Sequence, residues 1–555
     1  MTRTLASLAH WLFDPGCGAG DRVLPRWLFL RALGLIYFSA FFSLSFQIRG
    51  LIGPQGILPA HPYLQEVAVQ LGHARYWFAP TLLWISSSSA MLVTLCWLGM
   101  LASALLVFNI WPRAGLLICF VCFLSFISAA QDFSSYQSDG MLLEAGFISL
   151  FFAPRGFRPG WGEFSLPSRA SLFLLQWEWF RIYFESGVVK IASGDPQWRH
   201  MTAMDEYYQN GPLPTWIGWY VQHLPHWFHA SATVATLVLE LALVWMLWLP
   251  RRFRIACFFV VTLWQIPVIL TANYAFLNYL VLVLGFLLLD DRFLMRFLPR
   301  RQRPWLAPRV GSECGTGTSA AKSNPDTHSV GRTEELATRE PDAGPVRNHS
   351  RLAPFKLVLA AVPMIWIFYA STAQLLWMFS HAIPLPSAPV SALEPFRIAN
   401  QYGLFAVMTR GRYEIEFQGS QDGRTWIPYQ FRNKPQDPGE RPRIYAPYQP
   451  RFDWNLWFAS LGSWRENAIV PYTEAHLLSN DADVLALFRA NPFPANPPAE
   501  VRAVLWQYWF TSMTEQRAHG LWWRRQFLGL YAPTLNRTSN GKIAIVEMPT
   551  ESPKP

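Results

Sequence analysis

Charged residues are scarce in this sequence, and their scarcity limits what the protein can be. Asp, Glu, Lys and Arg make up 15% of the 555 residues, whereas ordinary soluble proteins carry about 25%. Hydrophobic residues reach 52%, and the chain contains 27 Trp. These values exclude an ordinary soluble protein over most of the chain. They are typical of a bilayer protein, where Trp collects at the interfaces.

Cysteine is also scarce, with six residues, none of them after residue 380. A domain in that region therefore has to fold without disulfides. Cys119 and Cys122 form a Cys-x-x-Cys motif inside an apolar stretch. A thiol in apolar surroundings stays protonated, so we expect no thiol–disulfide chemistry there.

Motifs of metal, nucleotide and acyl-transfer sites are absent from the sequence. We find no HxH, HExxH or paired CxxC pattern, no Walker loop and no GxSxG elbow. The net charge of +10 comes mostly from Arg between apolar stretches, without the basic helix of a nucleic-acid-binding protein. We therefore expect no metal, no cofactor and no nucleic-acid partner, and membrane lipids as the surroundings.

Apolar stretches recur along the chain at lengths close to those of membrane spans. A helix needs roughly 17–25 mostly apolar residues to cross the hydrocarbon core. The candidate spans are residues 27–48, 82–110, 114–130, 140–152, 172–191, 230–249, 255–270, 276–289 and 357–379. The sequence thus predicts a multi-pass α-helical membrane domain with about nine spans.

Arginine clusters predict the orientation of these spans. If there are about nine spans, five segments lie on the same side of the membrane. They are the segment before span one, those between spans two and three, four and five, and six and seven, and the segment after span eight. Each of these segments carries Arg. By the positive-inside rule that side is the cytoplasm. Residues 381–555 would then lie on the opposite, non-cytoplasmic side of the membrane.

Composition divides the chain into four parts. Residues 1–298 form the predicted helical transmembrane domain with eight spans, and 355–380 contain the ninth. Between them, 299–354 are rich in Pro, Gly, Ser, Thr and charge, which predicts a disordered cytoplasmic linker. The remaining residues, 381–555, are predicted to form a soluble, non-cytoplasmic, β-rich domain.

Strand patterns appear in this last part. Residues 413–417 alternate apolar and polar side chains, 421–424 supply turn residues, and 426–431 can return as a partner strand. We predict a β-hairpin there. Residues 484–489 and 501–511 are predicted to be helical, which makes the domain mixed.

Charged side chains inside the predicted spans are costly, so each is a candidate functional group. Glu178, Arg181 and Glu185 fall on one face of the fifth span, where Arg181 can pair with either carboxylate. Glu240, inside the sixth span, is expected to be protonated or paired with Arg31 or Arg181. The predicted intramembrane polar network consists of Arg31, Glu144, Glu178, Arg181, Glu185 and Glu240.

Lys190 lies near the non-cytoplasmic end of the fifth span, away from the face of Glu185. Two interpretations stay open for it. A lysine near a helix end can extend its amino group to the interface. A buried lysine with a lowered pKa can instead act as a base.

Several segments of the chain resemble the lipase maturation factor family. They are 27–31 (WLFLR), 51–59 (LIGPQGILP), 139–147 (DGMLLEAGF), 186–190 (SGVVK) with 193–196 (SGDP), 212–214 (PLP), 447–454 (PYQPRFDW) and 491–494 (NPFP). Together they span most of the chain apart from 299–354.

This resemblance implies a multi-pass membrane protein of the endoplasmic reticulum that assists the folding and assembly of secreted lipases. It also implies that the C-terminal domain faces the lumen and binds the client, a lipase-like secreted protein. Large aromatic residues are candidates for this client surface, although they can equally form the core of the β-rich domain. The candidates are Trp426, Trp454, Trp457 and Phe458.

A second resemblance is confined to the fifth span. Residues 184–191, with Trp198 following, look like the membrane segment of vitamin K-dependent gamma-carboxylase, a family in which a lysine placed like Lys190 is the active-site base. The alternative function is therefore a membrane enzyme acting on a lipid, quinone or peptide. An enzyme predicts a cavity that holds Lys190 beside other polar groups. A non-enzymatic maturation factor, the favoured hypothesis, predicts a paired or interfacial Lys190 and an exposed apolar patch on the outer domain.

Overall fold

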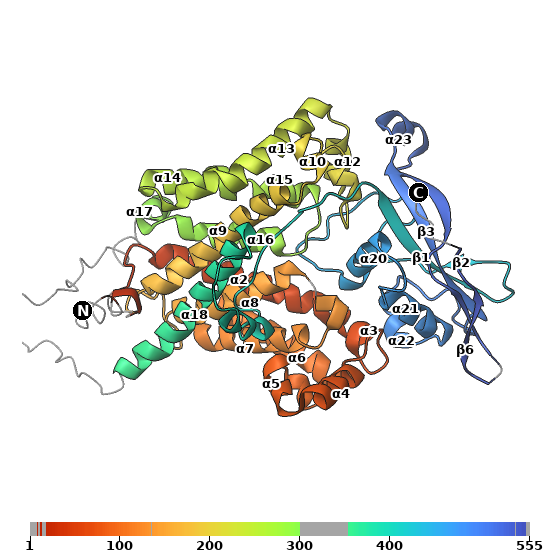
Figure 1. Ribbon diagram of the computed structural model, residues 1–555, viewed down its shortest axis with the longest axis horizontal. Helices are drawn as coiled ribbons and strands as arrows, with labels where there is room; N and C mark the ends of the chain where they lie inside the picture. Colours follow the sequence, from red (N-terminus) through yellow and green to blue (C-terminus); the bar gives the residue numbers. More distant parts are fainter. Residues whose placement is uncertain are drawn as a thin grey trace, which may run out of the picture.

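The computed structural model describes residues 8, 11–13, 18–134, 136–299, 353–538 and 540–550. Nearly all of the predicted linker, 299–354, lies outside these residues. Figure 1 shows a bundle of helices at the left and a β-sheet at the right, joined through short helices. The predicted arrangement of a helical region followed by a β-rich region is confirmed.

The helical region runs from α2 to α17 and is completed by α18. Its longer helices are α2 (Val23–Ser45), α4 (Ala60–Leu71), α6 (Ser89–Val107), α7 (Pro112–Ile127), α8 (Gln137–Phe152), α9 (Arg169–Ala192), α13 (His226–Leu241), α16 (Leu277–Gly285) and α18 (Ala353–Phe379). Its shorter helices are α3 (Ile48–Ile52), α5 (Arg75–Phe78), α10 (Pro196–Arg199), α11 (Tyr207–Asn210), α12 (Trp216–Gln222), α14 (Arg251–Cys257), α15 (Gln265–Thr271) and α17 (Asp291–Leu294).

Five helical segments in the described part of the chain are long and apolar enough to cross a membrane. They are Val23–Ser45, Ser89–Val107, His226–Trp248, Arg251–Thr271 and Leu357–Phe379. A helix also lies at each of the other four predicted positions. Of these, α7, α8 and the helix that begins with α16 are shorter, and α9 carries charged residues. The number of nine spans is therefore not confirmed.

Local sequence explains where α9 begins and ends. Ser168 caps its first turn, because the Ser168 hydroxyl accepts a hydrogen bond from the backbone N–H of Ser171. After the helix, Gly194 adopts a φ of +73°, which a residue with a side chain rarely adopts. Asp195 then caps α10 by accepting from the N–H of Gln197. The chain thus leaves the bundle in a fixed direction.

α18 packs along α9 although about 160 residues separate them in the chain. The Trp177 ring nitrogen donates to the Ser371 hydroxyl at 3.1 Å. Phe368 contacts the rings of Phe173 and Trp177. α18 begins at the end of the bundle that lies away from the sheet (Figure 1).

The C-terminal sheet contains β1 (Arg412–Ser420), β2 (Ile427–Pro428), β3 (Glu500–Phe510), β4 (Trp523–Leu530), β5 (Thr534–Arg537) and β6 (Ile543–Glu547). Its order is β2-β1-β3-β5-β6, and β4 also pairs with β3. β1 and β3 are antiparallel, from Arg412 opposite Tyr508 to Ser420 opposite Glu500. β1 and β2 form the predicted hairpin.

The prediction that 501–511 is helical is wrong, because these residues form most of β3, the central strand. Val501, Ala503 and Leu505 are 0% exposed on one face, and Tyr508 is buried on the other. A strand covered on both faces shows no polar alternation, so its apolar run resembles a buried helix. The predicted helix at 484–489 is wrong beyond Leu485, because α22 (Ala482–Leu485) ends there and Phe488 forms a β-bridge with Phe431.

Short helices lie between the sheet and the bundle (Figure 1). They are α20 (Arg451–Leu461), α21 (Ile469–Leu478) and α22, while α19 (Ala388–Ser391) follows α18 and α23 (Met513–His519) follows β3. Phe417 of β1 packs on Phe488, which also contacts Phe452 of α20. The core of the C-terminal region therefore lies on the face of the sheet turned toward the membrane helices.

Candidate functional site

A buried ion pair between two helices forms the centre of the polar network. The Arg181 guanidinium on α9 pairs with the Glu144 carboxylate on α8, and both side chains are at most 1% exposed. Glu185 lies farther off, with Oε1 at 3.9 Å from the nearest Arg181 nitrogen. The main partner of Arg181 is thus on a neighbouring helix, whereas the helical face had predicted a partner on α9 itself.

Residues that follow α18 donate further hydrogen bonds to Glu144. Asn400 donates its backbone N–H at 3.0 Å and its side-chain amide at 3.1 Å to Glu144 Oε2, and the Tyr402 hydroxyl donates to the same oxygen at 2.8 Å. The Tyr402 N–H donates to Glu185 Oε2 at 2.6 Å. The Glu144 carboxylate therefore accepts hydrogen bonds from three different residues, Arg181, Asn400 and Tyr402.

Glu178 is also wholly buried, and its carboxyl group lies near Glu144 and Arg181. Three carboxyl groups therefore share one guanidinium. A buried cluster is stable only when its charges are nearly balanced. Removal of one member of this group of four side chains would therefore leave a charge unpaired in the interior.

Two predicted members of the network lie elsewhere. Arg31 stacks over the Trp27 ring, with its guanidinium carbon 5.2 Å from the ring centroid. Glu240 pairs with Lys190, at 2.9 Å and 2.8 Å from Nζ to the two carboxylate oxygens. The prediction that Glu240 pairs with Arg31 or Arg181 is therefore wrong. α13 supplies this carboxylate, and sequence spacing gave no indication that α13 faces Lys190.

A close approach of α9 and α13 makes the Lys190–Glu240 pair possible. A Cβ atom on Gly187 would lie 2.8 Å from Leu241 and 3.0 Å from the Glu240 side chain. Lys190 is 2% exposed and also donates to the Ser186 carbonyl at 3.3 Å. Its interpretation as an interfacial lysine is therefore wrong. Its amino group donates to both carboxylate oxygens of Glu240, so it lies inside the bundle as one partner of a buried ion pair.

A segment after α18 lies across the end of α9. We call residues 402–408 the strap. Besides the Tyr402 contact, the Leu404 N–H donates to the Ser186 hydroxyl at 3.3 Å. The Phe405 carbonyl accepts from the Trp198 ring at 3.0 Å, and the Met408 N–H donates to Asp195 Oδ2 at 2.7 Å. Asp195 thus caps α10 with one oxygen and holds the strap with the other.

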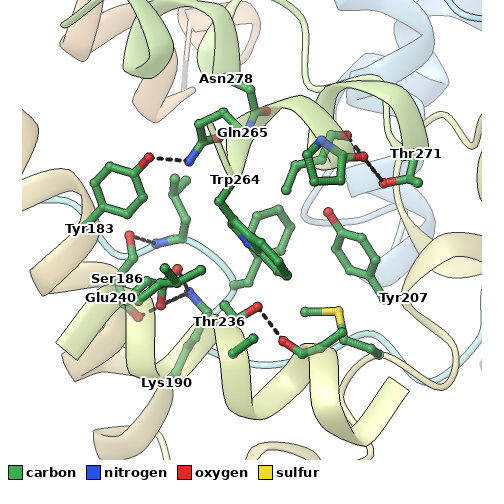
Figure 2. Close-up of a pocket in the computed structure, with 18 of the residues that line it drawn as sticks. Tyr183, Ser186, Lys190, Tyr207, Thr236, Glu240, Trp264, Gln265, Thr271 and Asn278 are labelled. Carbon is green, nitrogen blue, oxygen red and sulfur yellow. Dashed lines mark hydrogen bonds and ion pairs between the residues drawn. The ribbon is translucent and has the colours of Figure 1, made fainter. Parts of the chain in front are cut away.

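The strap closes one side of a cavity of about 430 Å³ inside the bundle. Figure 2 shows Lys190 and Glu240 on one wall and the pair of Gln265 and Tyr183 on another, with Trp264 near the centre of the view and Tyr207 across from them at the right. The cavity beside Lys190 is a feature that the enzyme hypothesis predicts. The pairing of Lys190 with Glu240 is a feature that the non-enzymatic hypothesis predicts.

The aromatic client candidates fall into two groups. Trp454 is 5% exposed and stacks on Tyr136, with ring centroids 4.9 Å apart. Trp457 is 8% exposed and donates from its ring to the Asn210 carbonyl at 3.1 Å. Both rings join α20 to the helical region and line a second cavity of about 380 Å³.

The other two candidates are more accessible. Phe458 is 45% exposed at the rim of that second cavity. Trp426 is half-buried under the guanidinium of Arg502, whose carbon lies 3.9 Å from the ring centroid. Of the four residues, only these two present a ring to a partner outside the chain.

The strongest contact between the two regions was not predicted. Arg451 donates from its two terminal nitrogens to the two oxygens of Asp139, both at 2.7 Å, and both side chains are 1% exposed. Asn400 and Tyr402 were not predicted either. Asp139 and Arg451 both lie in the segments that carry the family resemblance. Their opposite charges were the feature of the sequence that could have indicated this ion pair.

Comparisons with known proteins identify the family. Residues 24–296 match the family model described as the lipase maturation factor transmembrane domain, and 398–533 match that of the lipase maturation factor C-terminal domain. The chain is 33% identical to lipase maturation factor 2 of Homo sapiens over 610 residues, covering 93% of this chain and 83% of that protein. The chain belongs to the lipase maturation factor family.

Other members of this family give similar values. The identity is 31% to lipase maturation factor 1 of Bos taurus, covering 94% of this chain and 90% of that protein. It is 32% to lipase maturation factor 2 of Gallus gallus, covering 92% and 81%. No solved structure matches the chain.

The two matched domains of this lipase maturation factor family member contribute jointly to the site. Glu144, Arg181 and Asp139 lie in the transmembrane match, and Tyr402 and Arg451 lie in the C-terminal match. Within the described residues, no three His, Cys, Asp or Glu side chains are grouped as a metal site would require. The arrangement is suited to fixing the C-terminal domain rigidly on the membrane helices.

Proposed function

We propose that this chain is a membrane-anchored maturation factor that assists the folding and assembly of secreted proteins such as lipases, and that its C-terminal domain binds the client. The names of its relatives refer to lipase maturation. A buried ion pair fixes α20 of the C-terminal region to the helical region, so the membrane helices can hold a client-binding surface in one orientation.

One face of the sheet carries aromatic rings beneath arginines. Trp506 of β3 and Phe527 of β4 are paired residues whose ring centroids are 5.2 Å apart. The guanidinium of Arg525 lies 4.2 Å from the Trp506 ring centroid, and that of Arg502 lies over Trp426. We call Trp426, Arg502, Trp506, Arg525 and Phe527 the arginine–tryptophan surface. It is the observation that carries the proposal.

The arginine–tryptophan surface is on the side of β3 opposite to α21. Val501, Ala503 and Leu505 pack in the core together with Val470 of α21, whereas Trp506 is only partly buried and Phe527 is 49% exposed. Trp and Arg are enriched in protein interfaces and among their energetically dominant residues. We therefore expect this surface to be more stable in contact with a protein partner than in contact with solvent.

The edge of the same sheet also supports the proposal. β6 is the last strand of the sheet, and Ile543, Ile545 and Val546 are 47%, 57% and 49% exposed. Within the described residues, β6 pairs with β5 alone. An exposed apolar edge strand offers backbone hydrogen bonds to an extended segment, which a partly folded client possesses.

Replacement of the aromatic pair tests the proposal. We expect Trp506→Ala with Phe527→Ala to lower the secreted activity of a co-expressed lipase several-fold, together with its recovery on the purified factor. Tyr472→Ala removes an aromatic ring that is 52% exposed on α21, and this matched control should change neither quantity. Equal losses in the two variants, or no loss in either, would reject this surface as the client site.

We also propose the complete topology. About nine helices cross the membrane, residues 1–26 and 299–354 face the cytoplasm, and 381–555 lie on the opposite side. The arginine clusters of the sequence support this orientation. In a eukaryote the protein would reside in the endoplasmic reticulum membrane, and in a bacterium in the inner membrane, so that the C-terminal domain meets secreted clients.

A further inference from the structure

The cavity between α9, α13, α15 and α16 is not used by the proposed function. Its volume of about 430 Å³ falls in the range of small-molecule sites, roughly 300–1,000 Å³. Much of its wall is hydrocarbon, including Leu239, Val268, Leu277 and Val281. A water molecule needs two to four polar partners, so most of this space is poorly suited to water. The shape and lining suit a hydrocarbon chain.

The charged pair on the wall presents its carboxylate to the cavity. Lys190 and Glu240 both line the space, but the Lys190 side chain is 2% exposed and that of Glu240 is 14% exposed. The three hydrogens of Lys190 are directed to the two Glu240 oxygens and the Ser186 carbonyl. A carboxylate has about four acceptor positions, and Lys190 takes two. Glu240 therefore retains the capacity to accept a hydrogen bond from a ligand.

Charge selects among ligands that could use this acceptor. Lys190 and Glu240 together carry no net charge, so they do not compensate a charged ligand. A fatty acid anion would face the Glu240 carboxylate, and the one cation among the described residues that line the cavity, Lys190, is already paired with Glu240. A neutral hydroxyl group can donate to Glu240 without charge repulsion from the carboxylate and without bringing an uncompensated charge into the cavity. Figure 2 shows the Lys190–Glu240 pair on one side of the space, apart from Gln265 and Tyr183, which are hydrogen-bonded to each other on another side.

An opening toward the surface is also present. Ser231 of α13 lines the cavity and is exposed, and Ala235 one turn later lines it and is partly exposed. A ligand can therefore enter beside α13. α13 belongs to a segment that is long and apolar enough to cross a membrane, so the opening would be within reach of lipids.

We propose that this cavity binds a neutral lipid carrying a hydroxyl group, such as a monoacylglycerol, with Glu240 accepting the hydrogen bond of the hydroxyl and the apolar walls enclosing the chain. The strap covers one side of the site, because Leu404, Phe405 and Met408 line it. The site is separate from the arginine–tryptophan surface, and its existence does not depend on client binding.

Photo-crosslinking of the full chain in lipid nanodiscs tests the proposal. The probes are a 1-monoacylglycerol with a mid-chain diazirine, its dimethyl ether and the fatty acid of the same chain. We expect the monoacylglycerol to label α13, α15 or α16 and unlabelled 1-oleoylglycerol to compete. One buried hydrogen bond should favour it over the ether about five- to tenfold. Equal labelling by the ether or the fatty acid would overturn the assignment.

Two variants separate the parts of the site. Ala235→Phe fills the cavity and should abolish labelling by all three probes. Val234→Phe adds the same ring at the neighbouring residue, which is 44% exposed and does not line the cavity. This control should be labelled to the same extent as the unaltered chain.

Lys190→Met with Glu240→Met removes both charges at similar volume, a change that buried pairs often tolerate. This double variant should retain labelling but lose the preference for hydroxyl over ether, and a retained preference would show that Glu240 is not the acceptor.

Discussion

Arg451, the first residue of α20, donates two hydrogen bonds of 2.7 Å to Asp139, in the first turn of α8, across 312 positions of the sequence. The guanidinium also lies over the rings of Phe126 and Tyr136, at 5.0 Å and 5.3 Å from their centroids. The pair is inaccessible to water, so it connects the two regions without competition from solvent. Loss of either partner would leave an unpaired group in an apolar site.

Arg451→Met should therefore destabilise the protein by about 3–5 kcal/mol, because it leaves the Asp139 carboxylate without its counter-ion. Arg451→Met with Asp139→Asn should recover part of that loss. Arg489→Met is the matched control, since Arg489 pairs with Glu440 while 34% of its side chain is exposed. We expect this control to cost at most about 1 kcal/mol. Unfolding in detergent, followed by Trp fluorescence, measures all three, and equal losses for Arg451 and Arg489 would contradict the prediction.

Arg181→Met should lower the yield and the thermal midpoint, because it leaves the buried Glu144 carboxylate without its counter-ion. A second replacement identifies the main partner of Arg181. Glu144→Gln should restore more stability to Arg181→Met than Glu185→Gln does, since Arg181 contacts Glu144 directly and lies 3.9 Å from Glu185. Size-exclusion profiles and thermal unfolding distinguish the two double variants. A better rescue by Glu185→Gln would show that the pairing within α9 dominates.

Lys190→Met should be destabilising rather than silent, because it leaves the Glu240 carboxylate unpaired against α9. Breaking a buried pair costs roughly 3–5 kcal/mol. Lys190→Met with Glu240→Met should recover most of this stability. Lipase secretion should follow stability in both variants if the protein is not an enzyme. A stable double variant without any maturation activity would instead support the membrane enzyme hypothesis.

Glu474 gives the C-terminal domain a pH dependence. Burial in α21 raises the pKa of Glu474 well above its usual range. The folded domain then keeps a proton that the unfolded chain has lost above a pKa of about 4.3. Its contribution to stability is complete at lower pH and is lost as the pH rises toward the folded-state pKa.

Glu474→Gln should therefore reduce the loss of thermal stability between mildly acidic and neutral pH. Glu466→Gln, at an exposed residue, should leave the pH profile unchanged. Thermal unfolding measured across this pH interval compares the two variants with the unaltered chain. A Glu474→Gln profile parallel to that of the unaltered chain would show that Glu474 is already ionised in the folded state.

Reporter fusions test the topology. Alkaline phosphatase, which is active only outside the cytoplasm, should be active when fused after Pro386 and inactive when fused near residue 325. The physical basis is the retention of arginine clusters on the cytoplasmic side. Activities in the opposite order would require a different number of spans before α18.

The sequence alone determined that a helical region precedes a β-rich region, where the membrane-domain helices lie, and the family. Apolar stretches identify such helices because the bilayer tolerates few charges. It also predicted the hairpin of β1 and β2, because alternation and a turn are local patterns. It did not identify β3, because a strand covered on both faces loses that alternation.

Only the tertiary structure decided which charges meet. Sequence spacing relates Arg181 to Glu178 and Glu185 on one helix, but Glu144 reaches Arg181 from α8 and Glu240 reaches Lys190 from α13. The close approach at Gly187 and the strap across α9 depend on how separate helices pack, and no local pattern encodes them. A buried charge takes the nearest counter-charge in space, because the low dielectric of the interior makes separation costly, and the nearest partner in space is set by the fold.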